Sequence, residues 1–421
     1  MWRIIWNSWA LFVGILLMMI GNGLQGTLLG VRAGFEGFPT ALTGLLMSGY
    51  FAGFLVGSYI TPKLVDRVGH IRVYAALASL SSIAVLLHVI YIDPYAWTLM
   101  RLITGFCFAG LYVTVESWLN DVSTNKTRGM LLSFYLFLTY GGVVLGQLML
   151  NLADPRGAEL FILSSILVSL ALVPILLTVS PAPAVVERER LGFMEIYKIS
   201  PLGVLGSMIT GTIMGTLFGF EAVFAQAQGL DVKQISILLA VTYIGGTLSQ
   251  IPIGRISDGM DRRYVIVACS VLSGIAALGA IYNLGGPVIS LYISFTVLGI
   301  FILPLYSLLI AHANDHLRPN QMVAASSVLV MSGGIGAIFG PLLASAAMTA
   351  RGPVGFLWLL TTLVSLLTIY TLYRLSRSSV SLEDQPLYVP VSQKLTSVGT
   401  AISQQAVSEE LIADMTQKPS E

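Results

Sequence analysis

The chain has 421 residues, of which 55% are hydrophobic and 10% are charged, and its formal net charge is +1. Ordinary soluble domains carry about 25% charged residues, so this chain cannot hide its apolar runs in a soluble core. The near-neutral balance gives no overall field that would attract a polyanion, and we therefore expect no nucleic-acid partner.

Twelve runs of the chain are long and apolar enough to cross a membrane, which takes about 20 mostly apolar residues. We expect six near 9–29, 41–61, 73–92, 95–118, 130–151 and 160–179, and six more near 202–225, 235–254, 264–283, 288–311, 322–348 and 354–374. The sequence therefore predicts an all-α membrane protein of twelve transmembrane helices in two six-helix pseudo-symmetric halves, residues 1–179 and 201–375.

Two polar segments lie outside these runs. Residues 180–200 form the longest polar break between spans, and we interpret them as a cytoplasmic linker between the halves. Residues 376–421 are polar and contain three prolines, a composition that cannot bury enough apolar surface to order itself. We expect a disordered cytoplasmic tail there, although Val407–Met415 could form a short amphipathic helix.

Lysine and arginine residues lie mostly on one side of this arrangement. If the N-terminus is cytoplasmic, seventeen of them fall in cytoplasmic segments and four in outside loops. Because the cytoplasmic loops of membrane proteins carry the excess of positive charge, both termini are predicted to be cytoplasmic.

A short charged hinge follows the second span and returns after the eighth. The first hinge is residues 62–72 and the second is residues 254–263, and their aspartates, Asp66 and Asp258, are 192 residues apart. One spacing that recurs at several places indicates an internal duplication. The candidate conformational residues of the two hinges are Asp66, Arg67, Gly69, Arg72, Gly254, Asp258, Arg262 and Arg263.

Twelve spans with two such hinges resemble the major facilitator superfamily, whose hinge pattern is Gly-x-Leu-x-Asp-Arg-x-Gly-Arg-Arg. The first hinge departs from this pattern at Pro62, and the second departs at Ile256 and Asp261. A narrower match is to a poorly characterised bacterial branch typified by YcaD-like proteins. It depends on Val115-Glu116-Ser117-Trp118, Arg128-Gly129, Tyr140-Gly-Gly142 and Gly146-Gln147.

The resemblance implies a transporter in which the hinge clusters close the cytoplasmic side of the outward-facing state. Glu116 and Arg128 would join that network, unless they are simply solvated. The resemblance also implies that the first, fourth, seventh and tenth spans line the central cavity. Gln147 replaces the proline of the family's antiporter pattern Gly-x-x-x-Gly-Pro, so the fifth span does not support antiport.

Arg101 and Glu221 are the only ionisable residues that we place well inside spans. An arginine within the membrane costs about 2.5–3.5 kcal/mol on insertion scales, so it normally faces a cavity or a partner. Arg101 would bind an anionic group or take part in proton coupling, unless its side chain extends to the outer interface. Glu221 has apolar neighbours, which suits a proton carrier, unless it also sits at that interface.

Polar and aromatic residues of the spans are further candidates for the cavity wall. Asn22 and Gln25 are three residues apart and share a helix face. Amides and tyrosines also serve as packing and as hydrogen-bonding groups between helices, so both interpretations stay open. The other candidates are Tyr112, Tyr140, Gln147, Tyr243 and Gln250.

The expected function is secondary-active transport of a small organic solute, anionic or zwitterionic, across the bacterial inner membrane by alternating access with proton coupling. Efflux of amphipathic compounds by antiport and a sensor that keeps the fold without transport stay open as alternatives. The sequence has no evident nucleophile–base pair, nucleotide-binding loop or metal-ligand spacing, so we expect no enzyme, no cofactor and no metal. The expected partners are the solute, protons and membrane lipid, and the chain is expected to be a monomer.

Overall fold

The structure is a computed structural model, and it describes residues 9–124, 127–177, 192–377, 386, 388–392 and 394–417. Most of the expected linker, residues 180–191, lies outside this part of the chain, as do residues 378–385 and 418–421 of the expected tail. The described residues are helical or irregular, and no strand occurs among them.

Twelve of the helices are long and apolar enough to cross a membrane, which confirms the predicted number of spans. The first half contains α2 (Trp9–Phe35), α3 (Thr40–Val68), α4 (His70–Ile90), α5 (Pro94–Val122), α6 (Arg128–Leu148) and α7 (Glu159–Leu176). The second half contains α9 (Pro201–Ala227), α10 (Val232–Asp258), α11 (Arg262–Tyr282), α12 (Val288–Asn314), α13 (Pro319–Arg351) and α14 (Gly355–Leu375). The short helix η1 (Met149–Leu152) ends the fifth span, and α8 (Phe193–Ile199) lies before the seventh span.

Local sequence determines where several of these helices begin and end. Asp93 accepts hydrogen bonds from the first backbone amides of α5, and Pro94 occupies the first helical position, where no amide hydrogen is needed. Asp231 and Gln234 form a capping box at the start of α10. Gly69 separates α3 from α4 at φ +86°, a conformation that favours glycine. Because such caps lie beyond the apolar runs, most helices are longer than the runs themselves.

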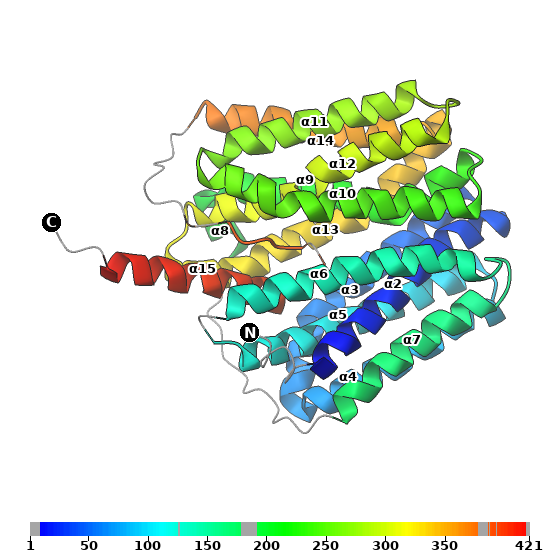
Figure 1. The fold of residues 1–421 in the computed structure, drawn as a ribbon, viewed down its shortest axis with the longest axis horizontal. Helices are drawn as coiled ribbons and strands as arrows, with labels where there is room; N and C mark the ends of the chain where they lie inside the picture. The colour runs from blue at the N-terminus through cyan, green and yellow to red at the C-terminus, as the bar shows by residue number, and fades with distance from the viewer. Residues whose placement is uncertain are drawn as a thin grey trace.

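Each half forms one bundle, and the two bundles lie side by side with their helices roughly parallel (Figure 1). In the first half, α2 packs on α6, α3 on α5 and α4 on α7. In the second half, α9 packs on α13, α10 on α12 and α11 on α14. The first helix of each half therefore packs on the fifth, the second on the fourth and the third on the sixth, so the halves are pseudo-symmetric repeats, as the duplicated hinge predicts.

Glycine residues bring the backbones of four of these pairs into direct contact. At Gly105 of α5, a Cβ atom would collide with the backbone of α3, and at Gly211 of α9 it would collide with the backbone of α13. Gly146 joins α6 to α2 in the same way, and Gly299 joins α12 to α10. Small residues allow this close approach of helices in membranes. Each half therefore contains two tightly joined helix pairs.

The halves contact each other directly at the end of the bundle that is remote from both hinges. There Ser48 of α3 donates a hydrogen bond to the backbone oxygen of Ile338 in α13, at 2.7 Å. Asn151 Nδ2 lies 2.7 Å from Ser236 Oγ, which joins η1 to α10. We call this end the opposite side, and we call the end that carries residues 62–72 and 254–263 the hinge side.

At the hinge side a further segment lies between the halves. This C-terminal segment, the described residues of 386–417, contains α15 (Ser397–Gln417) and packs against α5, α6 and α13 (Figure 1). Val391, Leu395 and Val398 are buried in a core that the spans form. The expectation of a disordered tail is therefore wrong for this segment. The composition argument failed because the apolar surface that orders the segment belongs to other helices.

Candidate functional site

A cavity of about 110 Å³ lies between the two halves. Its wall is mostly apolar and aromatic with a few polar groups, which is the composition typical of small-molecule sites. Both halves contribute, through α2, α3, α5 and α6 on one side and α9, α10 and α13 on the other. The polar and charged residues of the wall are Asn22, Thr27, Tyr50, Ser58, Arg101, Tyr112, Gln147, Glu221, Tyr243 and Lys394.

Arg101 lines this cavity from α5, two turns after the helix begins, and its side chain is buried. Its guanidinium carbon lies 4.3 Å from the centroid of the Tyr50 ring, an arrangement that attracts a cation to the ring face. Among the described residues, no group accepts a hydrogen bond from Nε or Nη1. The guanidinium group is therefore held by an aromatic ring and keeps donors that an anionic group in the cavity could use.

Glu221 lines the same cavity from α9 and is 1% exposed. Its Oε1 atom accepts a hydrogen bond from Thr242 Oγ1 at 2.6 Å, whereas Oε2 has no hydrogen-bond partner in the described part of the chain. No ion pair joins Glu221 to Arg101. The cavity thus contains a cationic group and a carboxyl group that do not satisfy each other.

Four of the remaining predicted residues also line the cavity, namely Asn22, Tyr112, Gln147 and Tyr243. Asn22 Nδ2 donates to the Tyr50 hydroxyl at 3.1 Å, so the ring beneath Arg101 is held from α2. The Tyr243 ring stacks on that of Phe218, with 4.8 Å between centroids.

Gln25, Tyr140 and Gln250 do not contribute to the cavity wall. Gln25 is fully buried and lies four residues, about 40° around the helix, from Gly21, which packs on α7. Gln250 Nε2 donates to the Tyr140 hydroxyl at 3.1 Å, and this bond joins α10 to α6 across the two halves. These two residues therefore form a contact between the halves beside the cavity.

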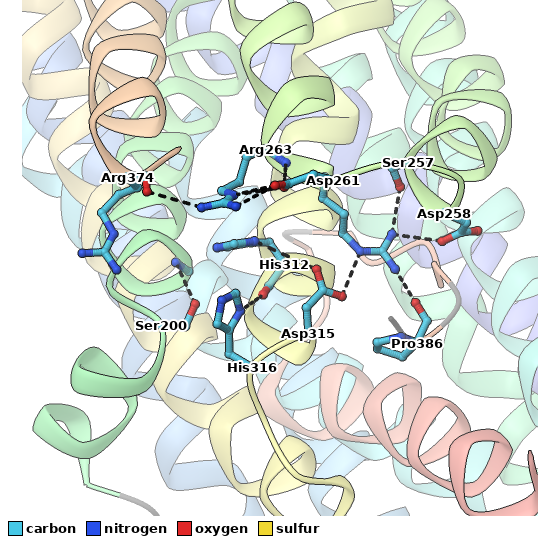
Figure 2. Close-up of polar contacts among 12 residues, drawn as sticks. Ser200, Ser257, Asp258, Asp261, Arg263, His312, Asp315, His316, Arg374 and Pro386 are labelled. Atoms are coloured by element: carbon cyan, nitrogen blue, oxygen red, sulfur yellow. Dashed lines mark hydrogen bonds and ion pairs between the residues drawn. The ribbon is translucent and has the colours of Figure 1, made fainter. Parts of the chain in front are cut away.

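The second hinge is a polar cluster around the guanidinium of Arg262, which is completely buried. Arg262 donates to Ser257 at 2.8 Å, Asp258 at 3.0 Å and Asp315 at 3.1 Å, and also to the backbone oxygen of Pro386. Figure 2 shows these four residues converging on the guanidinium. Burial raises the pKa of Asp315 to about 6, although the guanidinium opposes the shift. The cluster thus joins α10, α11 and the end of α12 to the C-terminal segment.

Two further hinge residues, Arg263 and Gly254, flank this cluster. Arg263 pairs with Asp261 at 2.6 Å (Figure 2). Burial alone would raise the pKa of Asp261, but the hydrogen bonds and charge of Arg263 lower it below its usual value. Gly254 faces the ring of Tyr388, so that an added Cβ atom would collide with the ring.

The first hinge makes no such contacts. Asp66, Arg67 and Arg72 are exposed, and no hydrogen bond or ion pair joins Asp66 or Arg67 to another side chain in the described ranges. The two hinges therefore differ in this structure, and among the described residues the C-terminal segment bonds to the second hinge.

Glu116 and Arg128 bind the C-terminal segment from the first half. Glu116 is fully buried and accepts hydrogen bonds from the backbone amide of Gly399 at 2.8 Å and from the hydroxyl and amide of Thr396. Arg128 pairs with Glu409 of α15. The sequence indicated a network at these residues but not the partner that they share.

Wall residues that the sequence did not indicate include Tyr50, Phe218 and Lys394. The two aromatic residues resemble the many others that only pack between helices. Lys394 lies in the segment that we expected to be disordered. Its Nζ atom is 5.0 Å from the centroid of Tyr243 and 5.2 Å from that of Phe218, so the segment places an ammonium group in the cavity.

Asp66→Asn is expected to raise the population of the state in which the halves meet at the opposite side. The carboxylate has no described partner here, so its loss costs nothing in this state, whereas an ion pair that it makes in the alternate state would be lost. Spin-label distances across both ends of the bundle measure the shift. The control is Asp121→Asn, another exposed aspartate on the hinge side. An unchanged distribution would mean that Asp66 only anchors its helix.

Two six-helix repeats that enclose a cavity between them are the architecture of secondary membrane transporters. The model of the Major Facilitator Superfamily matches residues 11–220 and 202–393, and the chain belongs to this superfamily.

Its curated relatives bear out the narrower resemblance. An uncharacterised MFS-type transporter of Enterobacter sp. (strain 638) is 30% identical over 334 residues, which cover 79% of this chain and 86% of the relative. The uncharacterised MFS-type transporter YcaD of Escherichia fergusonii has the same identity and coverage. The predicted similarity to YcaD-like proteins is therefore confirmed.

Solved structures share the fold at low identity. The nucleoside transporter NupG matches with a TM-score of 0.74 at 14% identity, over 88% of this chain and 100% of that chain. A bacterial homologue of the human lysosomal transporter Spinster, in an inward-facing and unoccupied conformation, matches with a TM-score of 0.66 at 15% identity, over 99% of each chain. Both similarities show the fold alone.

Proposed function

We propose that the chain is a secondary-active transporter that moves a small anionic or zwitterionic solute by alternating access, with proton coupling. One observation carries this proposal: Arg101 and Glu221 line one cavity between the two halves, and each keeps unsatisfied polar atoms there. In this assignment, Arg101 binds an anionic group of the solute and Glu221 carries the proton. A charge without a bound partner inside a membrane protein is costly and is typically retained for function.

The contacts between the halves support alternating access. Direct hydrogen bonds join the halves at the opposite side, through Ser48 and Asn151. At the hinge side the C-terminal segment lies between them. Rocking of the repeats about the cavity would close the hinge side and open the opposite side. The structure then corresponds to a state that faces the hinge side.

We further propose that the hinge side is cytoplasmic, in a bacterial inner membrane, with both termini inside and a monomeric chain. The bias of seventeen basic residues against four supports this orientation. Five of the seventeen, Arg3, Lys126, Arg188, Arg190 and Lys418, lie outside the described residues.

Single-cysteine labelling on intact cells tests the orientation. In a chain with Cys107 and Cys269 replaced by alanine, Arg67→Cys is expected to resist a membrane-impermeant maleimide until the cells are permeabilised. Tyr95→Cys, at a position 64% exposed on the opposite side, is the matched control and should react from outside at once. Ready labelling of residue 67 in intact cells would reverse the orientation.

Flux into proteoliposomes tests the function itself. A thermal-shift screen of amino acids, other zwitterions and carboxylates selects ligands of the purified chain, and uptake of each radiolabelled ligand is then measured with and without an imposed pH gradient. Gradient-driven accumulation of an anionic or zwitterionic compound is the expected result. Flux of lipophilic cationic dyes alone would favour amphipathic efflux, and binding without any flux would favour a sensor.

A further inference from the structure

The C-terminal segment crosses the hinge side and is anchored to both halves. On the second half, the Tyr388 amide donates to Asp258 at 2.8 Å, and the amide and carbonyl of Val391 bond to the hydroxyl of Ser307 at 3.0 and 2.6 Å. On the first half, Glu116 accepts hydrogen bonds from the start of α15. The segment therefore lies across the route by which the hinge side would communicate with the cavity.

Between these two sets of anchors, Lys394 extends into the cavity. Its ammonium group lies near the faces of Tyr243 and Phe218, at 5.0 and 5.2 Å from their centroids. These rings come from α10 and α9, and they stack on each other. No carboxylate among the described residues pairs with this ammonium group. Ring faces attract cations, so the rings form a subsite for an ammonium ion.

A lysine is a poor choice for simply filling this space. Placing an ammonium group away from bulk water is costly unless its surroundings are suited to a cation, and an apolar side chain would fill the gap at less cost. Lys394 is also not needed to hold the segment in place, because Asp258, Ser307 and Glu116 bond to other residues of the segment. The two ring faces therefore explain the position of this side chain.

We propose that the C-terminal segment is a tethered competitor of the transported solute, and that Lys394 occupies the subsite which takes an ammonium group of that solute. The proposal rests on the proposed function and narrows its substrate class to zwitterions. Their ammonium group lies on Phe218 and Tyr243, and their anionic group binds Arg101. The second half thus recognises the cationic end of the solute, and the first half recognises the anionic end.

Tethering makes this competition strong. A ligand that belongs to the same chain competes at an effective concentration set by its tether and not by the bulk solution, on the order of millimolar for short tethers. The solute enters from the hinge side only when the segment leaves, and the halves can meet at the hinge side only after the same release. Release of the segment therefore precedes both binding and the conformational change.

A cysteine in the cavity wall reports whether the segment blocks access. Ser58→Cys is placed in the full chain with Cys107 and Cys269 replaced by alanine, and its rate of reaction with a hydrophilic maleimide is measured. Gly399→Leu, whose side chain would collide with the carboxyl group of Glu116, is expected to displace the segment and to raise the rate at least tenfold. Gly192→Leu, where an added Cβ atom meets nothing, is the control. An unchanged rate in Gly399→Leu would overturn the blocking role.

The subsite is tested with n-butylammonium, which reproduces the lysine side chain, and with butan-1-ol as its neutral counterpart. Both chains carry Ser58→Cys, and protection means that n-butylammonium slows the reaction of this position with the maleimide. In Lys394→Met, this protection is expected at a concentration at least fivefold lower than in the chain that keeps Lys394. Lys198→Met, an exposed lysine in α8, is the control. Adding Tyr243→Leu to Lys394→Met should remove the protection.

Equal protection with and without Lys394, or equal protection by butan-1-ol, would overturn the subsite. These labelling measurements need no transport, so they separate the two proposals. Protection by n-butylammonium in a chain that transports neither an anionic nor a zwitterionic compound would refute the transport function and leave the ammonium subsite in place. Transport of a zwitterion without this protection would refute the subsite alone.

Discussion

Replacing Arg101 by alanine is expected to lower uptake of the solute at least a hundredfold. The guanidinium is held over the Tyr50 ring at 4.3 Å, and its Nε and Nη1 donors have no partner among the described residues. A hydrogen bond to a charged group contributes about 1.5–3 kcal/mol. Loss of two such bonds therefore lowers affinity by a factor of about a hundred or more, since about 1.4 kcal/mol corresponds to tenfold.

The measurement is initial uptake into proteoliposomes at equal protein density. Arg156→Ala is a matched control, because Arg156 also lies over an aromatic ring, that of Phe35 at 4.5 Å, but does not line the cavity. Arg101→Lys should fall between the wild type and alanine, since lysine keeps the charge without the planar fork of donors. If Arg101→Ala transports normally, the assignment of the anionic end of the solute to this residue is wrong.

Replacing Glu221 by glutamine is expected to abolish accumulation driven by a pH gradient while exchange of solute across the membrane continues. The amide keeps the shape of the side chain and can still accept the hydrogen bond from Thr242, so the cavity is preserved. It cannot take up or release a proton at accessible pH, and the coupling is lost with that ability.

The comparison needs counterflow of labelled solute and accumulation under an imposed gradient, in the same vesicles. Glu116→Gln provides the control, because Glu116 is also a fully buried glutamate but its oxygens are taken up by the C-terminal segment. That variant should keep gradient-driven accumulation. Continued accumulation in Glu221→Gln would assign the proton to another group.

Much of this fold could be predicted from the sequence, because long apolar runs are a direct physical requirement of membrane-spanning helices. A membrane span must be long, apolar and helical, so each of the twelve spans is evident from its own residues. The same constraint made Arg101 and Glu221 conspicuous, since a charge within a span needs a specific environment. Both line the cavity in the structure.

The amides and tyrosines were harder to assign, because their role depends on the direction in which they point around a helix. Asn22 and Gln25 differ by three residues, yet only Asn22 lines the cavity. Tyr140 and Gln250 bond to each other across the two halves, and no periodicity within either helix indicates that contact.

The C-terminal segment could not be predicted, because the groups that order it are far away in the sequence. Glu116 and Ser307 bind its backbone, and the spans cover its apolar side chains. Local composition describes what a segment can bury on its own and says nothing about a groove that other helices provide. The only local indication was the amphipathic pattern of Val407–Met415, which lies within the longer α15.

The four glycine-joined helix pairs determine how far a small movement at the cavity can reach. Helices α3 and α5 each contain 29 residues, or about 44 Å at 1.5 Å per residue, and their contact at Gly105 leaves no side chain that could yield between them. Such a pair behaves as a stiff lever. A tilt of about 10° around its midpoint displaces each end by about 4 Å, with the two ends moving in opposite directions. In the proposed alternating access, stiffness within each half would allow one small rotation to close one face of the membrane as it opens the other.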